Sequence, residues 1–376
     1  MNGREKIWSA FAPEGAAEIP VVIPYEDIFI RDHWSTLSRK PWWVRASFDV
    51  ETQVTWRREI AEVIGQDWFS LASGASKKVR KRFTVDERDG VVYRIDRLSG
   101  SAEVLEPPAI SGWSGRGVAS IHPKNPPQTP GQVERWIVQW DVPGQALKDG
   151  RTDLPRHILA DWGAALYPMG YINGPLWSCY YLWGFEGMMT HLVEHPELVR
   201  VAVERFIEQT LGQIQMAARL GAKGIWLEDC LTDMVSPQHY ATFNLPYLRQ
   251  LTDAIRGWGM RTVHYFCGNP SGKWELLLDT GADALALEES KKGFAIDIDD
   301  VVARVNGRMV VLGNLDAVGI LEQADEATMR AEIRRHIAAG RRNGSRFIMS
   351  LGSPVTPDTP ASRVRLYCDL AHELGR

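Results

Sequence analysis

Several common features are missing from this 376-residue sequence, and each absence narrows the class of protein. It contains no run of about 18 apolar residues, so we expect no membrane-spanning helix. The N-terminal residues lack the apolar core of a signal peptide. The four cysteines (Cys179, Cys230, Cys267 and Cys368) are too widely spaced to suggest a disulfide framework. We therefore expect a cytoplasmic protein with reduced thiols.

Two signatures of binding are also missing. The sequence has neither a Gly-x-Gly-x-x-Gly pattern nor a Walker phosphate-binding loop. The formal net charge of -4 leaves no basic footprint of the kind that binds nucleic acid. We expect neither nucleic acid nor a membrane as the partner.

Short apolar runs alternate with helix-like segments along most of the chain, which is typical of a parallel sheet. Eight strands are predicted, at residues 19–24, 136–140, 164–172, 224–227, 262–266, 282–287, 309–313 and 347–351. The main helices are predicted near residues 51–64, 153–162, 198–214, 237–257, 271–279, 297–305, 325–340 and 359–374. Eight βα units predict an α/β fold of the (β/α)8 TIM-barrel type, with residues 1–376 as one domain. A doubly wound open sheet is the alternative, because its sequence pattern is similar.

Residues 76–106 have a different character. Alternating residues at 77–85 and 91–95 flank Asp89-Gly90, and a second turn at Ser99-Gly100 precedes residues 102–105. Asp-Gly between alternating runs is a strong hairpin signal. We predict an antiparallel β-meander inserted at about residues 75–110. Its basic run, residues 77–82, is interpreted as a solvated edge strand, with docking of an acidic partner as the alternative.

Polar side chains follow the predicted strands, where a barrel gathers its strand ends at one mouth. The candidates are Tyr25, Asp27, Asn173, Glu228, Asp229, Cys230, His264, Cys267, Glu288, Glu289, Asn314, Asp316 and Ser353. Asp229, Asp316 and Ser353 also suit a structural role as helix caps or loop hydrogen-bond partners. Fifteen tryptophans are present, and they suit core packing or an aromatic substrate cage.

The segment from Arg261 to Asn269, with His264, Cys267 and Gly268, resembles the His-x-Cys-Gly strand of the uroporphyrinogen decarboxylase-like superfamily. Further segments resemble that superfamily in the same order, at residues 170–175, 184–187, 228–229, 236–247, 313–316, 350–352 and 359–360. The resemblance covers residues 160–376 and implies a barrel. In character the chain is closest to the corrinoid-dependent methyltransferases of that superfamily.

The zinc-dependent methyltransferases of the superfamily carry His-x-Cys here and a second Cys after the last strand. This chain has Tyr265 at the histidine position and Ser353 at the second cysteine position. The resemblance implies zinc, with Cys267, His264 and Glu228 as ligands and Glu288 as another carboxylate that could replace the missing cysteine. Strand alternation places His264 on the face opposite Cys267, unless the strand ends or bulges between them.

The arginine-rich N-terminal motif of uroporphyrinogen decarboxylases has no match here, Arg31-Asp32-His33 being the nearest sequence. The acidic mouth instead suits a neutral or cationic substrate, or a metal. The resemblance then implies a methyltransferase that moves a methyl group between a small methylated donor and a corrinoid protein. Alternatives are a uroporphyrinogen-type decarboxylase and a non-catalytic corrinoid or small-molecule binding barrel.

Nearby aromatic residues favour an aryl methyl ether, and therefore O-demethylation. The predicted catalytic residues are Glu228, Asp229 and His264. The predicted substrate-binding residues are Tyr25, Asn173, Trp177, Trp226, Tyr265, Glu288 and Asn314. We expect the corrinoid protein to dock over an open mouth. The identity of the methyl donor and the presence of a homodimer stay open.

Overall fold

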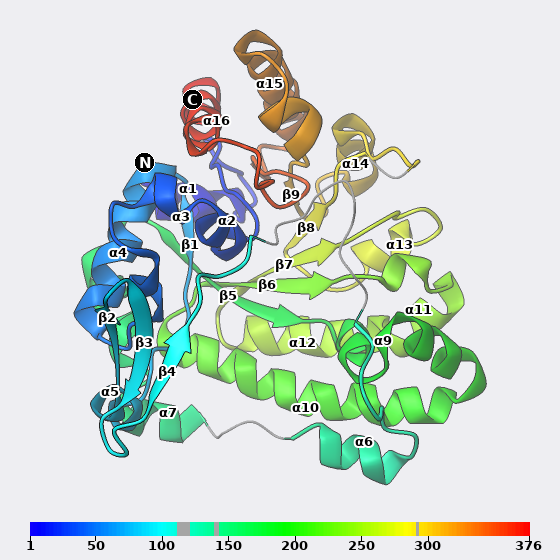
Figure 1. Ribbon diagram of the computed structural model, residues 1–376. Helices are drawn as coiled ribbons and strands as arrows, with labels where there is room; N and C mark the ends of the chain where they lie inside the picture. The colour runs from blue at the N-terminus through cyan, green and yellow to red at the C-terminus, as the bar shows by residue number, and fades with distance from the viewer. Residues whose placement is uncertain (111–120, 139–142, 291–292) are drawn as a thin grey trace.

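The computed structural model describes residues 1–110, 121–138, 143–290 and 293–376 (Figure 1). Its centre is a curled parallel sheet of seven strands in the order β1-β5-β6-β7-β8-β9-β10. These strands are β1 (Trp68–Ser70), β5 (Tyr167–Asn173), β6 (Gly224–Asp229), β7 (Arg261–Phe266), β8 (Ala284–Leu287), β9 (Val310–Leu312) and β10 (Phe347–Ile348). The predicted α/β class with parallel strands is confirmed.

The predicted first strand, residues 19–24, lies between the two edges of this sheet. Val21 forms a parallel bridge to Met349 beside β10, and its carbonyl oxygen accepts a 2.9 Å hydrogen bond from the Asp67 amide next to β1. Pro20 and Pro24 lack N–H donors, so this segment cannot form a regular ladder. It contributes single bridges in place of a full strand.

Helices cover the outer side of the sheet, and α9, α10 and α12 run along one flank in Figure 1. The N-terminal helices are α1 (Gly3–Ala10), α2 (Glu26–Asp32), α3 (Trp34–Leu37), the 3-10 helix η1 (Trp42–Ala46), α4 (Val50–Ile64), α5 (Lys77–Arg82), α6 (Pro130–Trp136), α7 (Pro143–Asp149) and α8 (Asp153–Asp161). The later ones are α9 (Pro175–Glu194), α10 (Pro196–Leu220), η2 (Thr232–Met234), α11 (Pro237–Phe243), α12 (Leu245–Gly257), α13 (Trp274–Leu278), α14 (Ile298–Val305), the π-helical η3 (Ala317–Glu322), α15 (Glu326–Arg342) and α16 (Ala361–Leu374). Among the described residues, no helix has the length and apolar character needed to cross a membrane.

The inserted meander is confirmed as a separate antiparallel sheet of β2 (Phe83–Arg88), β3 (Val91–Asp96) and β4 (Ala102–Leu105). The interpretation of residues 77–82 as an edge strand is wrong, because they form α5. The Ser76 side chain caps that helix by accepting a hydrogen bond from the Val79 amide. Lys and Arg are good helix formers, so an N-cap was enough to override the apparent alternation.

The predicted strand at residues 136–140 is also wrong for the residues that are described. Trp136 ends α6, which begins with Thr129 as N-cap and Pro130 in its first turn, while Val138 lies outside any strand. Residues 139–140 lie outside the described part of the chain. A short apolar run cannot by itself distinguish strand from helix. The position in the sheet next to β5 belongs to the three-residue strand β1, which the sequence analysis missed.

Candidate active site

The register of the parallel strands sorts the polar strand ends onto two faces. Glu228 of β6 pairs with Asn173 of β5 on one side and with Tyr265 of β7 on the other. Leu227 pairs with His264 one position earlier. Because side chains alternate along a strand, Asn173, Glu228 and Tyr265 share the inner face, and His264 points to the opposite one.

A row of polar contacts crosses the ends of β6, β7 and β8 on the inner face. The Tyr25 hydroxyl donates to Glu228 Oε1 at 2.9 Å, and the Cys230 thiol donates to the same oxygen at 3.2 Å. Cys267 follows β7 beside the end of β6, since its amide donates to the Asp229 carbonyl oxygen at 3.1 Å. The Cys267 thiol donates to Glu288 Oε1 at 3.3 Å. We call these five residues the acid–thiol cluster.

Burial shapes the protonation of this cluster. It raises the pKa of Glu228 above its usual range, against the effect of the hydrogen bonds from Cys230 and Tyr25. The hydrogen bond with Cys267 and burial raise the pKa of the Cys230 thiol. Burial also raises the pKa of Tyr25. Glu228, Cys230 and Tyr25 are therefore biased toward their protonated, neutral forms.

The backbone around the cluster is unusual at three places. Tyr25 and Leu231 have φ values of 55° and 60°, in the left-handed region that non-glycine residues rarely adopt. Gly268, directly after Cys267, has φ of 108°, and a Cβ there would lie 2.2 Å from the Asp233 side chain. Both thiol-bearing strands thus turn sharply just after their cysteine. Strained backbone of this kind gathers at functional sites.

Asp229 and His264 belong to a different, fully buried group on the helix-facing side. The Asp229 carboxylate accepts hydrogen bonds from Thr232 Oγ1 at 2.9 Å, Tyr240 Oη at 2.8 Å and Asn244 Nδ2 at 2.9 Å. His264 Nε2 lies 3.3 Å from Asp229 Oδ2. Both side chains have zero exposure. The structure therefore brings Asp229 and His264 together and separates them from the acid–thiol cluster.

The aromatic candidates form a wall beside the cluster. The rings of Trp226 and Tyr265 stack with centroids 4.9 Å apart, and Tyr25 contacts both rings edge-on. The Tyr265 hydroxyl donates to the Gly352 carbonyl oxygen at 3.0 Å. Trp177 instead stacks on Tyr180, with centroids 5.0 Å apart.

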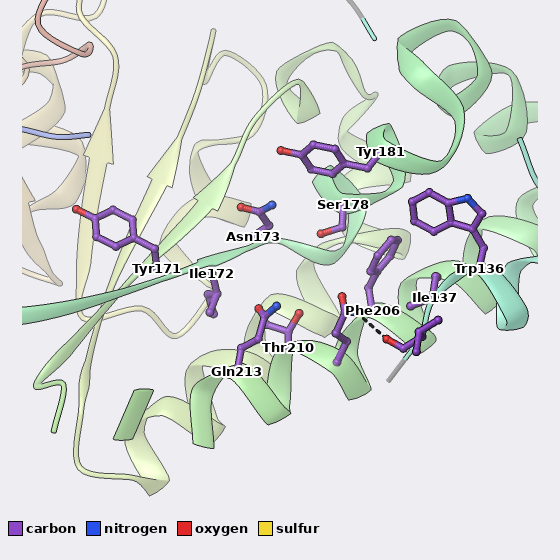
Figure 2. Close-up of a pocket in the computed structure, with 12 residues that line it drawn as sticks. Trp136, Ile137, Tyr171, Ile172, Asn173, Ser178, Tyr181, Phe206, Thr210 and Gln213 are labelled. Carbon is purple, nitrogen blue, oxygen red and sulfur yellow. Dashed lines mark hydrogen bonds between the residues drawn. The ribbon is translucent and has the colours of Figure 1, made fainter. Parts of the chain in front are cut away.

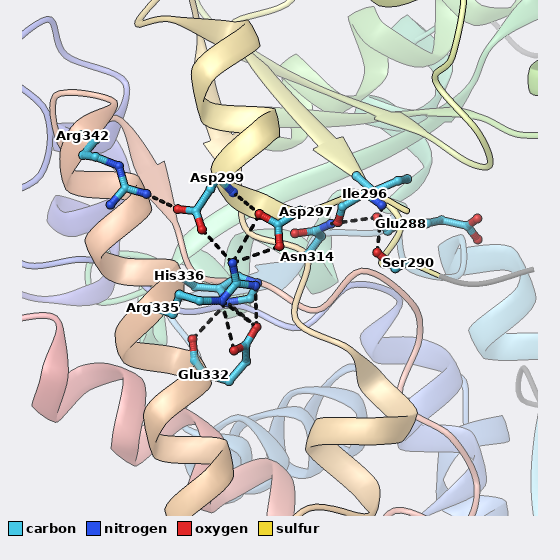
Figure 3. Close-up of polar contacts among 10 residues, drawn as sticks. All are labelled: Glu288, Ser290, Ile296, Asp297, Asp299, Asn314, Glu332, Arg335, His336 and Arg342. Atoms are coloured by element: carbon cyan, nitrogen blue, oxygen red, sulfur yellow. Dashed lines mark hydrogen bonds and ion pairs between the residues drawn. The ribbon is translucent and has the colours of Figure 1, made fainter. Parts of the chain in front are cut away.

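Asn314 acts on the backbone that carries Glu288. Its Nδ2 donates to the carbonyl oxygens of Glu288 at 3.0 Å and Ile296 at 2.9 Å (Figure 3). Farther out in the same view, Arg335 ties Asp297 of the loop before α14 to Glu332 of α15. Asn314 thereby holds the backbone directly after β8, where Glu288 is located.

The remaining candidates have structural partners. Asp316 caps η3 by accepting from the amides of Val318 and Gly319, as the cap interpretation predicted. The Ser353 hydroxyl donates to Glu289 Oε2 at 2.8 Å. Asp27 lines a small cavity of about 90 Å³ together with Glu26, Arg57 and nearby aromatic side chains.

A larger cavity of about 760 Å³ adjoins the cluster (Figure 2). It is lined by Trp136, Ile137, Val138, Tyr171, Ile172, Asn173, Ser178, Tyr181, Phe206, Gln209, Thr210 and Gln213. Asn173 connects this lining to the cluster, since it lines the cavity and pairs with Glu228 in the sheet. Burial raises the pKa of Tyr181, and the nearby Glu228 carboxyl adds to that rise. All the described lining residues are uncharged, and four of them are aromatic.

The predicted zinc ligands do not gather. Cys267 and Glu228 both belong to the acid–thiol cluster, while His264 lies with Asp229 in the helix-facing layer. Within the described ranges, no three His, Cys, Asp or Glu side chains are grouped as a ready metal site. The thiol that accompanies Cys267 is Cys230, which the sequence analysis included only as a general mouth candidate. Its position two residues after Glu228 was the available signal.

Comparisons with known proteins identify a family that this chain matches. The family model described as "Uroporphyrinogen decarboxylase (URO-D)" matches residues 156–374. The uroporphyrinogen decarboxylase of Edwardsiella ictaluri is 28% identical over 183 residues, which are 48% of this chain and 49% of that protein. The Desulfotalea psychrophila enzyme is 26% identical over 55% of this chain and 60% of its own length. This chain therefore spans about half the length of the curated relatives that it matches.

A solved structure described as a methyltransferase from Methanosarcina mazei is similar over 99% of both chains. Its TM-score is 0.66 and its sequence identity is 16%. At that identity the likeness establishes a shared fold.

Proposed function

We propose that this chain, which belongs to the uroporphyrinogen decarboxylase family, is a methyltransferase that moves a methyl group from a small methylated compound to a corrinoid protein. The lining of the large cavity carries this proposal. Its described residues are aromatic or uncharged polar groups. Such a lining suits a neutral aromatic compound, whereas a tetrapyrrole with several carboxylates would call for bidentate arginine partners. The full-length fold likeness to a methyltransferase adds support.

We favour an aryl methyl ether as the donor and propose Glu228 as the general acid. In this reaction the methyl carbon leaves the ether oxygen and bonds to the reduced cobalt of the partner's corrinoid. The electron pair stays on the oxygen, which takes the Glu228 proton and leaves as a phenol. Tyr25 would hold Glu228 in place through its 2.9 Å hydrogen bond. Re-protonation from solvent restores Glu228.

The other predicted site residues take supporting roles in this proposal. Asn173, which lines the cavity, would contact the donor, the buried Trp226 and Tyr265 rings would support the inner face, and Trp177 would support the cavity from α9. Asp229 and His264 are proposed as positioning residues, because they fix the end of β6 from behind. Zinc, which the family resemblance implies, is given no role in this proposal, because His264 lies apart from Cys267 and Glu228.

The bridges of Val21 to both sheet edges support a closed (β/α)8 barrel, with residues 19–24 in the eighth position. In a closed barrel all strand ends meet at one mouth. We propose that the corrinoid protein docks over that mouth, because its cobalt must approach the donor there.

The test is an assay of methyl transfer to free cob(I)alamin with a panel of methoxylated aromatics, methanol and methylamines. The proposal expects turnover with at least one methoxylated aromatic. It also expects a loss of roughly 10²–10⁴-fold in kcat for Glu228→Gln, the range for removal of a general acid. Glu194→Gln, at an exposed site on α9, is the matched control. Decarboxylation of uroporphyrinogen without methyl transfer would refute the proposal in favour of the activity named for the relatives.

A further inference from the structure

We infer that a small cavity walled by α2, α4 and β1 binds one small carboxylate anion, held by Arg57 and by the indole N–H groups of Trp56 and Trp162 (Figure 1). The volume of this cavity is about 90 Å³. That is room for about three water molecules, or for one carboxylate of two or three carbons. The cavity shares no lining residue with the large cavity or with the acid–thiol cluster, so the inference does not rest on the proposed function.

Arg57 brings a positive charge to this cavity. Its guanidinium carbon lies 4.1 Å from the centroid of the Trp56 ring, and its Nη1 atom donates to the backbone and side-chain oxygens of Gln53. Within the described ranges, Gln53 is its only hydrogen-bond acceptor, and no carboxylate lies within ion-pair distance. Burial lowers the pKa of Arg57 to about 10, so the group stays charged at neutral pH. A partly buried cation favours an anionic partner, and a carboxylate can accept from the remaining N–H groups of the guanidinium.

Two indole groups in the same lining lack acceptors. Trp56 of α4 and Trp162, directly after α8, both line the cavity and are more than nine-tenths buried. Their Nε1 atoms have no hydrogen-bond partner in the part of the chain that the structure describes. Trp68 lines the cavity too, but its Nε1 atom donates to the Ile23 carbonyl oxygen at 3.1 Å. Because buried donors are nearly always paired, the two indoles indicate an acceptor that the chain itself does not supply.

The carboxyl group of Glu26, which also lines the cavity, has other partners. Its Oε1 atom accepts from the Ser70 amide at 2.6 Å, and its Oε2 atom accepts from Gln66 Nε2. Burial raises the pKa of Glu26 to about 8, so at neutral pH this carboxyl is mostly protonated and does not repel an anion beside it. The groups that need a partner here are therefore a cation and two N–H donors, which together are the complement of a carboxylate.

The lining also determines how an anion enters and how large it can be. Asp27 and Ala72 are the exposed residues of the lining, so a small solute can enter from solvent beside them. The charge of Asp27 opposes an anion, but Arg45 and Arg57 both interact with it electrostatically, and solvent screens it. Most of the other lining side chains are apolar, which suits the short alkyl end of a carboxylate and limits its length.

The test is isothermal titration calorimetry of the full chain with sodium acetate, at neutral pH in a buffer free of other carboxylates. We expect one acetate to bind per chain. Acetamide has nearly the same shape without the charge, and it should bind at least about tenfold more weakly, because a charged acceptor forms the stronger hydrogen bonds. Wild-type protein that binds no acetate would overturn the inference and leave water as the acceptor. Equal binding of acetamide and acetate would overturn it as well.

Three variants locate the bound acetate. Arg57→Gln removes the cation, and Trp162→Phe removes one indole donor but keeps an aromatic ring, so each should weaken acetate binding by about tenfold or more. Arg58→Gln is the matched control, because Arg58 is exposed on the same helix and pairs with Asp161, and it should bind like the wild type. Circular dichroism checks that each variant folds, and Trp162→Phe decides the outcome if Arg57→Gln does not fold. Unchanged affinity in the folded variants, or an equal loss in Arg58→Gln, would overturn the inference.

Discussion

Glu228 and Asp229 are consecutive residues whose carboxyl groups face opposite sides of the sheet. Glu228 contacts Tyr25 and Cys230 at the mouth, while the carboxylate of Asp229 is enclosed by side chains of η2, α11 and β7 and by Asn244. Alternation along β6 separates a group available for chemistry from one that fixes the strand end.

This separation predicts opposite effects for two neighbouring substitutions. Asp229→Ala should lower the free energy of unfolding by about 3 kcal/mol or more, because it leaves several buried donors without their acceptor. Glu228→Gln should change it by no more than about 1 kcal/mol while lowering kcat. Urea unfolding of both proteins provides the measurement. If Asp229→Asn keeps wild-type stability yet abolishes turnover, Asp229 takes part in the chemistry and the structural assignment fails.

The turn after Cys267 should depend on glycine. Gly268→Ala places a Cβ 2.2 Å from the Asp233 side chain in addition to the strain of a positive φ. Gly259→Ala is the matched control, since it also has a positive φ, of 71°, but nothing lies within 4 Å of its Cβ. We expect Gly259→Ala to lower the free energy of unfolding by about 1 kcal/mol, and Gly268→Ala to lower it by at least about 1 kcal/mol more. Thermal or urea unfolding measures both values. An equal loss of unfolding free energy in the two variants would show that the Asp233 side chain moves aside without an energetic penalty.

Glu26 should make stability fall as pH rises. Burial raises the pKa of this carboxyl to about 8, against an ordinary value of 4.5. The folded state therefore holds a proton that the unfolded state releases, so the free energy of unfolding decreases between about pH 4.5 and pH 8. The decrease should be on the order of 5 kcal/mol, and it should level off above that window.

Glu26→Gln should remove most of this slope, because glutamine does not titrate. The control is Glu194→Gln, at an exposed position on α9, which should keep the wild-type slope. Urea unfolding at a series of pH values measures this slope for both variants. A Glu26→Gln protein with an unchanged slope would place the titration on another buried group.

The large cavity should control the size of the donor. Gln213 lines it from α10 and is partly exposed, so Gln213→Trp can add bulk to the cavity with little disturbance of the core. We expect KM for a methoxylated aromatic to rise about tenfold or more, equivalent to about 1.4 kcal/mol. Gln213→Ala should bind the same donor much as the wild type does. An unchanged KM in Gln213→Trp would place the donor elsewhere.

The sequence by itself determined most of the secondary structure and the composition of the strand ends. The apolar runs that became β6, β7 and β8 are short, and each is followed by polar residues, so their role as strands leading to a mouth could be read directly. Asp89-Gly90 determined the hairpin of the inserted sheet, because few other residues tolerate the turn. Asp49 caps the N-terminus of α4 and Gly65 caps its C-terminus, close to the predicted limits of the helix.

Only the tertiary structure decided which of these polar groups meet. Cys230 and Cys267 are far apart in the sequence, and the register between β6 and β7 makes them neighbours. His264 lies beside Asp229 behind the sheet, on the face opposite Cys267, as strand alternation had predicted, whereas the family motif had implied a shared zinc site. The local sequence pattern shows which residues follow each strand. Pairing between strands depends on packing over the whole sheet, and a one-residue change of register would move every side chain to the other face.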